Sequence, residues 1–254
     1  MSIREEAFLR RGNIRATRNL VIRTIFHSPI AMMPEASEGA AYDPSCRRCP
    51  RLARFLDTVA ADYPSYWCKP VPPFGDPMAR LVIVGLAPGM HGANASGRPF
   101  TGDYAGILLY ETLYAYGFGS SPQSVSRTDV LTLRNCRITN AVKCLPPQNK
   151  PAPSEIGACN SYLRIELAKL PRDAAVLALG RIAHDAALRA LGVAGAKCKF
   201  AHGARHELAN DVVLFDSYHC SRYNTNTRRL TPQMFRDVFD AVAAHFADSK
   251  QSAE

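Results

Sequence analysis

The stretch that decides the fold runs from Leu81 to Asp103 and reads LVIVGLAPGMHGANASGRPFTGD. Its first five residues form an apolar run, rich in β-branched side chains, that ends at Gly85. Such a run is typical of a strand buried in a parallel sheet, and the glycines that follow indicate a loop at its carboxyl end. Since α/β proteins bind ligands at the carboxyl ends of their strands, we expect a ligand site beside this loop.

The rest of the chain repeats this alternation of strand and helix. Three more apolar runs predict buried strands at Asn135–Lys143, Ala174–Gly180 and Val212–Tyr218. Helical patterns predict helices at about Tyr104–Tyr116, Ser154–Lys169 (with Ser154 as N-cap), Arg181–Ala190 and Thr231–Ala247. Together these elements predict an α/β fold with a four-stranded, mostly parallel central sheet and helices on both faces.

The composition excludes several classes of protein. The chain has 254 residues, of which 47% are hydrophobic and 21% charged, unlike a collagen, a coiled coil or a largely disordered chain. No apolar run approaches the roughly 18 residues that a membrane-spanning helix needs. The N-terminus is charged from Arg4 onward and lacks the apolar core of a secretory signal. We therefore expect a cytoplasmic protein with no membrane partner.

The first 75 residues differ from the α/β body, which we place at residues 76–248. A basic amphipathic stretch at about Glu5–Ile25 precedes a loop with Cys46 and Cys49 and then a segment rich in proline and aromatic residues. We expect residues 1–75 to form a lobe packed on the body, and residues 249–254 to form a disordered tail.

Positive charge dominates the chain. It carries 31 Lys and Arg against 22 Asp and Glu, a net charge of +9. The segment between His219 and Thr231 contains Arg222, Arg228 and Arg229 and no acidic residue. This balance suits a polyanionic partner and favours a nucleic acid.

Cysteine spacing points to a metal centre. A disulfide framework is a poor explanation for the eight cysteines of a cytosolic chain. Cys46 and Cys49 are spaced to share one metal, and a Pro-rich hairpin can bring Cys159 back to Cys144. Four thiolates can hold zinc or an iron–sulfur cluster, and separate buried thiols are the alternative. We assign the remaining cysteines to packing or solvent: Cys68, Cys136, Cys198 and Cys220.

Four side chains at the expected carboxyl edge of the sheet are candidates for chemistry. The Gly-rich loop lacks the P-loop and dinucleotide-binding patterns, but Phe100 can offer a stacking face to a flat ligand. Asp103 can serve as a catalytic carboxylate or as the N-cap of the next helix. Asn140 can bind a pyrimidine edge or a neighbouring strand. His219 follows the last strand, where a histidine is more often functional than elsewhere.

Three motifs together resemble the family 5 (UDGb-type) uracil-DNA glycosylases. They are Gly85–Gly89 with Gly97–Asp103, Thr139–Cys144 through to Cys159, and Tyr218–Thr231. The resemblance implies a three-layer α/β/α fold, an N-terminal iron–sulfur lobe, and excision of deaminated bases from DNA. It also implies a structural [4Fe–4S] cluster, with Cys46, Cys49, Cys144 and Cys159 as ligands.

The resemblance also implies roles for the candidate residues. A target base flipped out of DNA would stack on Phe100 and form hydrogen bonds with Asn140. His219 would stabilise the departing base, and Asp103 the sugar cation or the attacking water. The base pocket would be completed by Gly85, Leu86, Ala87, Pro88 and Gly89. DNA would be contacted by Arg222, Tyr223, Asn224, Arg228 and Arg229, of which Arg222 or Tyr223 would enter the duplex as a wedge.

Two residues refine this interpretation. Leu86 stands where family 4 enzymes have Glu, which favours family 5, and Arg228 stands where Gly is usual. The chain also lacks the basic, His-ending insert of relatives that form a covalent bond to the abasic sugar. Small residues at the pocket mouth predict room for hypoxanthine, ethenocytosine and 5-hydroxymethyluracil.

The expected partner is double-stranded DNA, with single-stranded DNA as a further substrate, and the expected enzyme is a monomer. Two alternatives remain open: a uracil-DNA-binding protein without turnover, and a zinc-stapled nucleic-acid-binding protein.

Overall fold

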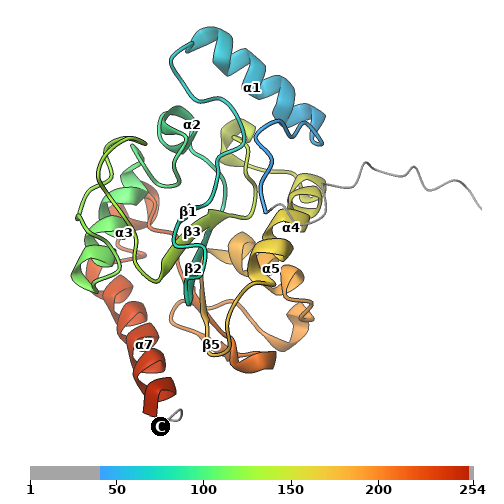
Figure 1. Ribbon diagram of the computed structural model, residues 1–254. Coiled ribbons are helices and arrows are strands. Elements are labelled where there is room, and N and C mark those ends of the chain that lie inside the picture. Colours follow the sequence, from blue (N-terminus) through green and yellow to red (C-terminus); the bar gives the residue numbers. More distant parts are fainter. Residues whose placement is uncertain (1–40, 252–254) are drawn as a thin grey trace, which may run out of the picture. The chain divides into compact units, whose positions relative to one another are not determined.

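The computed structural model describes residues 41–251 (Figure 1). The expected basic helix at Glu5–Ile25 and the last three residues lie outside the described residues. No helix within residues 41–251 is long and apolar enough to cross a membrane.

A six-stranded mixed sheet forms the centre of the fold, in the order β1-β3-β2-β4-β6-β5. Its four inner strands are parallel and are β2 (Leu81–Gly85), β3 (Cys136–Asn140), β4 (Ala175–Leu179) and β6 (Val213–Ser217). The register places Gly85 of β2 directly beside Asn140 of β3. The carboxyl ends of all four strands therefore lie at one edge of the sheet.

The expectation of a four-stranded sheet was incomplete, because two short antiparallel strands extend its edges. β1 (Phe74–Gly75) pairs with β3, and β5 (Arg205–Glu207) pairs with β6. Neither strand forms an apolar run: β1 has two residues, and β5 consists of charged and polar side chains. Edge strands of this kind are short and polar, so hydrophobic patterning does not reveal them.

Helices cover both faces of the sheet and make three layers (Figure 1). One face packs against α3 (Tyr104–Ala115) and α7 (Pro232–Gln251), and the other against α4 (Pro153–Leu167) and α5 (Arg181–Ala190). Alternate residues of each inner strand supply the two cores, because successive side chains of a strand point to opposite faces. In β2, Ile83 joins the α3 side and Val84 the α4 side.

Two helix ends differ from expectation. α4 starts at Pro153 with Ala152 at the N-cap position, not Ser154, because proline is suited to the first helical residue. The Glu155 carboxylate instead accepts a 2.7 Å hydrogen bond from the Ala152 backbone N–H. α7 continues to Gln251, past the expected end at 247, so the first three residues of the expected tail are helical.

Residues 41–75 contribute helix α1 (Pro50–Asp62), which packs on the hairpin between β3 and α4. Leu52 and Leu56 are buried there against Val142 and Leu145. Five short helices occupy loops: α2 (Ala93–Ser96), α6 (Arg222–Asn226), and the 3-10 turns η1 (Pro147–Asn149), η2 (Gly195–Lys197) and η3 (Ala209–Asp211).

Candidate active site

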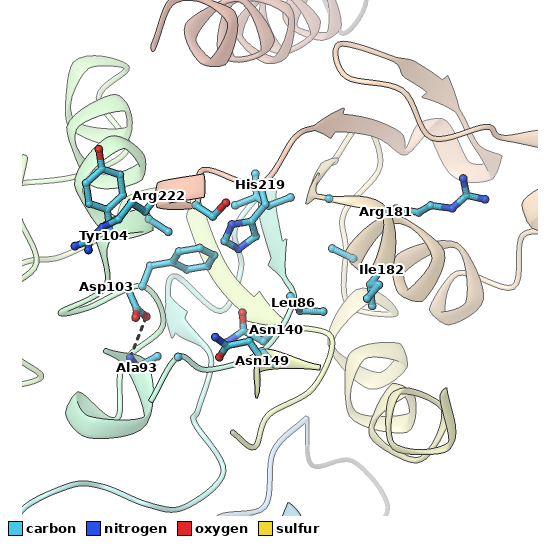
Figure 2. A pocket seen from close by; sticks show the side chains of 18 residues that line it. Leu86, Ala93, Asp103, Tyr104, Asn140, Asn149, Arg181, Ile182, His219 and Arg222 are labelled. Atoms are coloured by element: carbon cyan, nitrogen blue, oxygen red, sulfur yellow. Dashed lines mark hydrogen bonds between the residues drawn. The ribbon is translucent and has the colours of Figure 1, made fainter. Parts of the chain in front are cut away.

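A cavity of about 650 Å³ opens at the carboxyl edge of the parallel strands (Figure 2). This volume falls within the roughly 300–1,000 Å³ of small-molecule sites. Eight of the residues expected at the site line it: Leu86, Ala87, Gly89, Phe100, Asp103, Asn140, His219 and Arg222.

Gly85 does not line the cavity, but its missing side chain shapes the wall. A Cβ at this position would lie 2.4 Å from Asn140 Oδ1 and 2.8 Å from Phe100 Cζ. Phe100 itself adopts a left-handed backbone (φ 57°), and its carbonyl fits against Gly106 of α3, where a Cβ would clash. Glycines therefore allow the ring and the amide to converge on the same wall. Pro88 is outside the cavity lining.

Asp103 occupies the N-cap position of α3, but its side chain makes no capping bond within the described chain. Its Oδ2 accepts a 3.1 Å hydrogen bond from the Ala93 backbone N–H, drawn in Figure 2. The carboxyl group lies against Gly89 and Gly92, where any Cβ would overlap it. Burial raises the pKa of the Asp103 carboxyl above its ordinary value, partly opposed by the Ala93 hydrogen bond. The carboxyl group is therefore held in the cavity wall instead of capping its helix.

His219 is half-buried, with its exposed surface in the cavity. Its ring stacks with Phe100 at 5.8 Å between centroids and 27° between planes. Its Nδ1 is buried and has no hydrogen-bond partner among residues 41–251. Burial lowers the pKa of His219 to about 4. The imidazole is therefore neutral at physiological pH and keeps one ring nitrogen for a ligand.

The loop after His219 is ordered by its own polar groups. Asn224 donates a 2.8 Å hydrogen bond from Nδ2 to the His219 carbonyl, so its amide braces the loop. Arg222 lies over the Tyr104 ring at 5.0 Å from its centroid, at the cavity mouth. Tyr223 is 70% exposed. The loop thus presents an arginine in the cavity lining and, at the next position, an exposed aromatic ring.

The two remaining arginines of this loop lie beyond the cavity lining. Arg228 has a left-handed backbone (φ 57°), the conformation that glycine adopts most readily. This explains why glycine would suit the position. Arg229 stacks its guanidinium 4.6 Å from the centroid of the Tyr218 ring.

Sequence reasoning missed the cavity residues contributed by α2, α3, β4, α5, the η1 turn and two loop positions. They are Ala93, Tyr104, Ala105, Asn149, Leu179, Gly180, Arg181, Ile182, Ala183 and Ser221. Gly180 ends the expected strand at Ala174–Gly180 and Arg181 follows it, so the rule that ligands bind at the carboxyl ends of strands also applied there. Asn149 gave no such signal, because a left-handed turn (φ 56°) far from any strand end carries it to the cavity.

The four cysteines expected to share a metal lie around one second cavity, below α1. Cys46 and Cys49 come from the turn before α1, Cys144 from the loop after β3, and Cys159 from α4. The Lys143 backbone N–H lies 3.3 Å from Cys159 Sγ. The hairpin therefore returns Cys159 to Cys144 as its length suggested.

The surroundings of this cysteine site suit an anionic metal–thiolate group. Burial raises the pKa of the Cys49 thiol to about 11, and the nearby Cys159 and Cys46 raise it further. Crowded thiolates need a cation between them, and Arg48 lines the same cavity with a buried Nε that has no partner in the described chain. The remaining cysteines lie elsewhere: Cys136, Cys198 and Cys220 are buried in the cores, and Cys68 is half-buried.

A Gly-rich loop, a stacking ring, an amide and an imidazole at the carboxyl edge of a parallel sheet define a site for a flat, polar ligand. The family model described as the uracil DNA glycosylase superfamily matches residues 72–243, which contain every residue lining the cavity. The chain therefore belongs to the uracil DNA glycosylase superfamily. Within it the chain belongs to the type-5 family, whose members include proteins 44% and 45% identical to it.

Two Type-5 relatives and one Type-4 relative illustrate the likeness. The Type-5 uracil-DNA glycosylase of Thermus thermophilus is 45% identical over 199 residues, which cover 76% of this chain and 90% of that protein. The Type-5 enzyme of Pyrobaculum aerophilum is 44% identical over 204 residues, covering 79% and 88%. A Type-4 uracil-DNA glycosylase of Archaeoglobus fulgidus is 36% identical over 140 residues, covering 55% and 56%. The expected resemblance to family 5 is thus confirmed.

Proposed function

We propose that this chain is a monofunctional uracil-DNA glycosylase that hydrolyses the N-glycosidic bond of deaminated bases and leaves an abasic site in DNA. The neutral His219, with its unpartnered buried Nδ1 in a cavity shared with Phe100 and Asn140, carries this proposal. The membership of the uracil DNA glycosylase superfamily supports it.

Phe100 and Asn140, whose ring and amide converge beside Gly85, are suited to recognise the base. Phe100 offers a π-face, and a base stacked on an aromatic ring gains about 1–3 kcal/mol. Asn140 carries both a donor and an acceptor, which match the adjacent carbonyl and N–H of a uracil edge. The Asn140 side-chain amide makes no hydrogen bond within residues 41–251, although the residue is buried. This leaves the amide available for the base.

His219 is suited to stabilise the leaving base. Cleavage of the glycosidic bond leaves negative charge on the base, and a fixed donor in a partly dry site stabilises that charge more than water does. A neutral imidazole donates one N–H and stays neutral, because burial opposes its protonation. The histidine therefore acts as a hydrogen-bond donor and not as a positively charged acid.

Asp103 is suited to the sugar side of the reaction. An oxocarbenium-like sugar is stabilised by a nearby carboxylate, which can also orient the attacking water. The Ala93 N–H holds one carboxylate oxygen, and the other remains for the water or the sugar. This fixed orientation favours one direction of attack.

The cavity dimensions support a broad range of bases. Alanine and glycine contribute much of the lining, and the volume of about 650 Å³ exceeds what a single pyrimidine occupies. We infer that hypoxanthine, ethenocytosine and 5-hydroxymethyluracil are substrates besides uracil. Excision confined to uracil, under conditions where uracil is fully removed, would contradict this.

DNA contact is assigned to the loop after β6. Arg222, Arg228 and Arg229 supply positive charge, which implies double-stranded DNA affinity that falls with salt and that extends to single strands. Tyr223, exposed beside the cavity mouth, is the side chain best placed to fill the gap left by a flipped base. Unstacking that base costs a few kcal/mol, which the wedge and the phosphate contacts offset.

We further propose that Cys46, Cys49, Cys144 and Cys159 hold a structural [4Fe–4S] cluster. When bound, the cluster would be held by four thiolate–iron bonds. These bonds would cross-link the turn before α1 to the β3–α4 hairpin. Arg48 and the Lys143 N–H would balance its negative charge. No cysteine of this set lines the base cavity, so base excision needs no redox step. Iron and acid-labile sulfide content of the purified protein tests this directly, and zinc in their place would favour the zinc-stapled alternative.

The experiment that tests the function uses an end-labelled duplex with one U opposite G. After incubation with the protein, strand breakage that appears only after hot alkali means base excision without strand cleavage. An intact strand from protein that still binds the duplex would favour the uracil-binding alternative. Binding without preference for uracil would favour the zinc-stapled one.

A further inference from the structure

A third cluster of polar side chains lies on the α4–α5 face of the sheet, apart from both sites above. It joins His184 of α5, His206 of β5 and Asp216 of β6, one ligand atom of each lying within 4.8 Å of the others. His184 and Asp216 are almost completely buried, at 1% and 0% exposure. None of the three lines the base cavity or the cysteine cavity. A buried carboxylate such as Asp216 is costly unless a partner balances its negative charge.

The hydrogen bonds of His184 set one of its ring nitrogens directly against an oxygen of Asp216. His184 Nε2 lies 3.1 Å from the Cys198 carbonyl oxygen, which can only accept, so Nε2 carries the proton. In neutral His184 the lone pair of Nδ1 then faces Asp216 Oδ1 at 2.8 Å. Two acceptors at this distance repel unless a proton or a metal ion lies between them.

We propose that His184, His206 and Asp216 bind a divalent transition-metal ion of the zinc class. His206 Nε2 lies 3.1 Å from Asp216 Oδ2, so both carboxylate oxygens face imidazole nitrogens. Two imidazoles and one carboxylate are a donor set that zinc accepts, whereas magnesium and calcium prefer oxygen ligands alone. The Cys198 carbonyl holds the far side of His184, as such oxygens do for metal-bound histidines.

The position of the cluster gives the ion an entry path and a role. His206 is the member with exposed surface, 14% of its side chain, because it lies on the edge strand β5. A solvent molecule can complete the coordination from that side. The ion would fasten α5 and β5 to β6 at Asp216, three residues before His219. It would therefore stiffen the strand that leads to His219. This inference does not depend on the proposed glycosylase activity.

Cobalt(II) in place of zinc separates this site from the cysteines. The protein is used with its iron–sulfur centre intact, and difference spectra are recorded against the same preparation without cobalt. One equivalent of cobalt should give tetrahedral d–d bands without thiolate-to-cobalt charge-transfer bands. Charge-transfer bands with no separate nitrogen- and oxygen-bound species would overturn the proposal, because the cobalt would then be bound by cysteines.

Two variants and one control make the assignment specific. H206Q and D216N should each abolish the cobalt bands, and E207Q should keep them, because Glu207 is an exposed neighbour on the same strand. Saturating zinc should raise the melting temperature of the wild type and of E207Q by on the order of 5 °C. It should leave H206Q and D216N unchanged. H206Q changes a partly exposed edge residue, so it keeps the test valid if D216N fails to fold.

Failure has an equally definite form. If the wild type binds no cobalt or zinc beyond the cysteine site, or if H206Q binds it unchanged, the metal proposal is wrong. The cluster is then a buried network of histidine–carboxylate hydrogen bonds.

Discussion

Replacing Gly85 with alanine tests whether the active-site wall depends on the missing side chain. The new Cβ would lie 2.4 Å from Asn140 Oδ1 and 2.8 Å from Phe100 Cζ. Ordinary contacts of this kind are about 3.5–4.0 Å. The amide and the ring must therefore retreat by roughly 1 Å, since Gly85 and Asn140 are fixed side by side in the parallel sheet.

The expected cost falls mainly on catalysis. A displacement of about 1 Å in a group that positions the substrate can cost roughly 100-fold in rate. Overpacking also lowers the free energy of unfolding, by about 1–3 kcal/mol, which a domain of this size can tolerate. We expect G85A to fold with the metal content of the wild type and to excise uracil about 100 times more slowly under single-turnover conditions.

The matched control is G157A on helix α4. There the new Cβ meets only the end of the Arg189 side chain, at 3.4 Å, and alanine favours the helix by about 0.5–1 kcal/mol over glycine. G157A should keep the wild-type rate and melt no lower than the wild type. A G85A protein that is folded and excises uracil within about threefold of the wild type would refute the packing argument.

Three further predictions concern titration, the metal centre and the DNA loop. Because burial lowers the pKa of His219 to about 4, the excision rate should show no inflection near pH 6.5, and an inflection there would contradict a buried neutral imidazole. Because of the same shift, His219 binds a proton between about pH 6.5 and 4 in the unfolded chain but stays unprotonated in the folded chain. Stability should therefore fall over this range by on the order of 2 kcal/mol, allowing for partial exposure, and H219Q should flatten the slope in denaturant titrations. C46S should lose visible absorbance and melt at a lower temperature. C68S, whose site lies outside the cysteine cavity, should keep the absorbance and the melting temperature of the wild type. An unchanged iron content in C46S would show that Cys46 is not a ligand. R228G should change stability by less than about 1 kcal/mol, since relief of the left-handed strain is offset by unfolded-state entropy. The DNA affinity of R228G should fall, and the slope of log affinity against log salt concentration should decrease by about one phosphate contact. Binding titrations at two salt concentrations that match the wild type would exclude a phosphate contact by Arg228.

The parallel core of this fold was predictable because its signal is local. Runs such as Leu81–Gly85 are apolar over their whole length, and only a strand covered on both faces requires that pattern. β5 was not predictable, because Arg205 and Glu207 are exposed and the strand is defined only by its pairing with β6. The same holds for Asn149, which a left-handed turn brings to the cavity.

The site was predictable to the extent that topology places strand ends together. Asn140 and Gly85 had to be neighbours once β2 and β3 were parallel and in register, and His219 follows the end of β6. Side-chain directions lay beyond sequence reasoning. Asp103 turns away from the cap of its own helix toward Ala93, and the Asn224 side-chain amide donates a hydrogen bond to the His219 carbonyl.

The central claim is that this cavity releases uracil from DNA by hydrolysis. The most direct measurement is mass-spectrometric detection of free uracil after mixing the protein with a duplex containing one U opposite G, for the wild type and for N140A and H219A. The wild type should release free uracil in amounts that exceed the enzyme, and each variant should release it at least 100-fold more slowly. Tight and uracil-selective binding by the wild type, with no free base released, would contradict it.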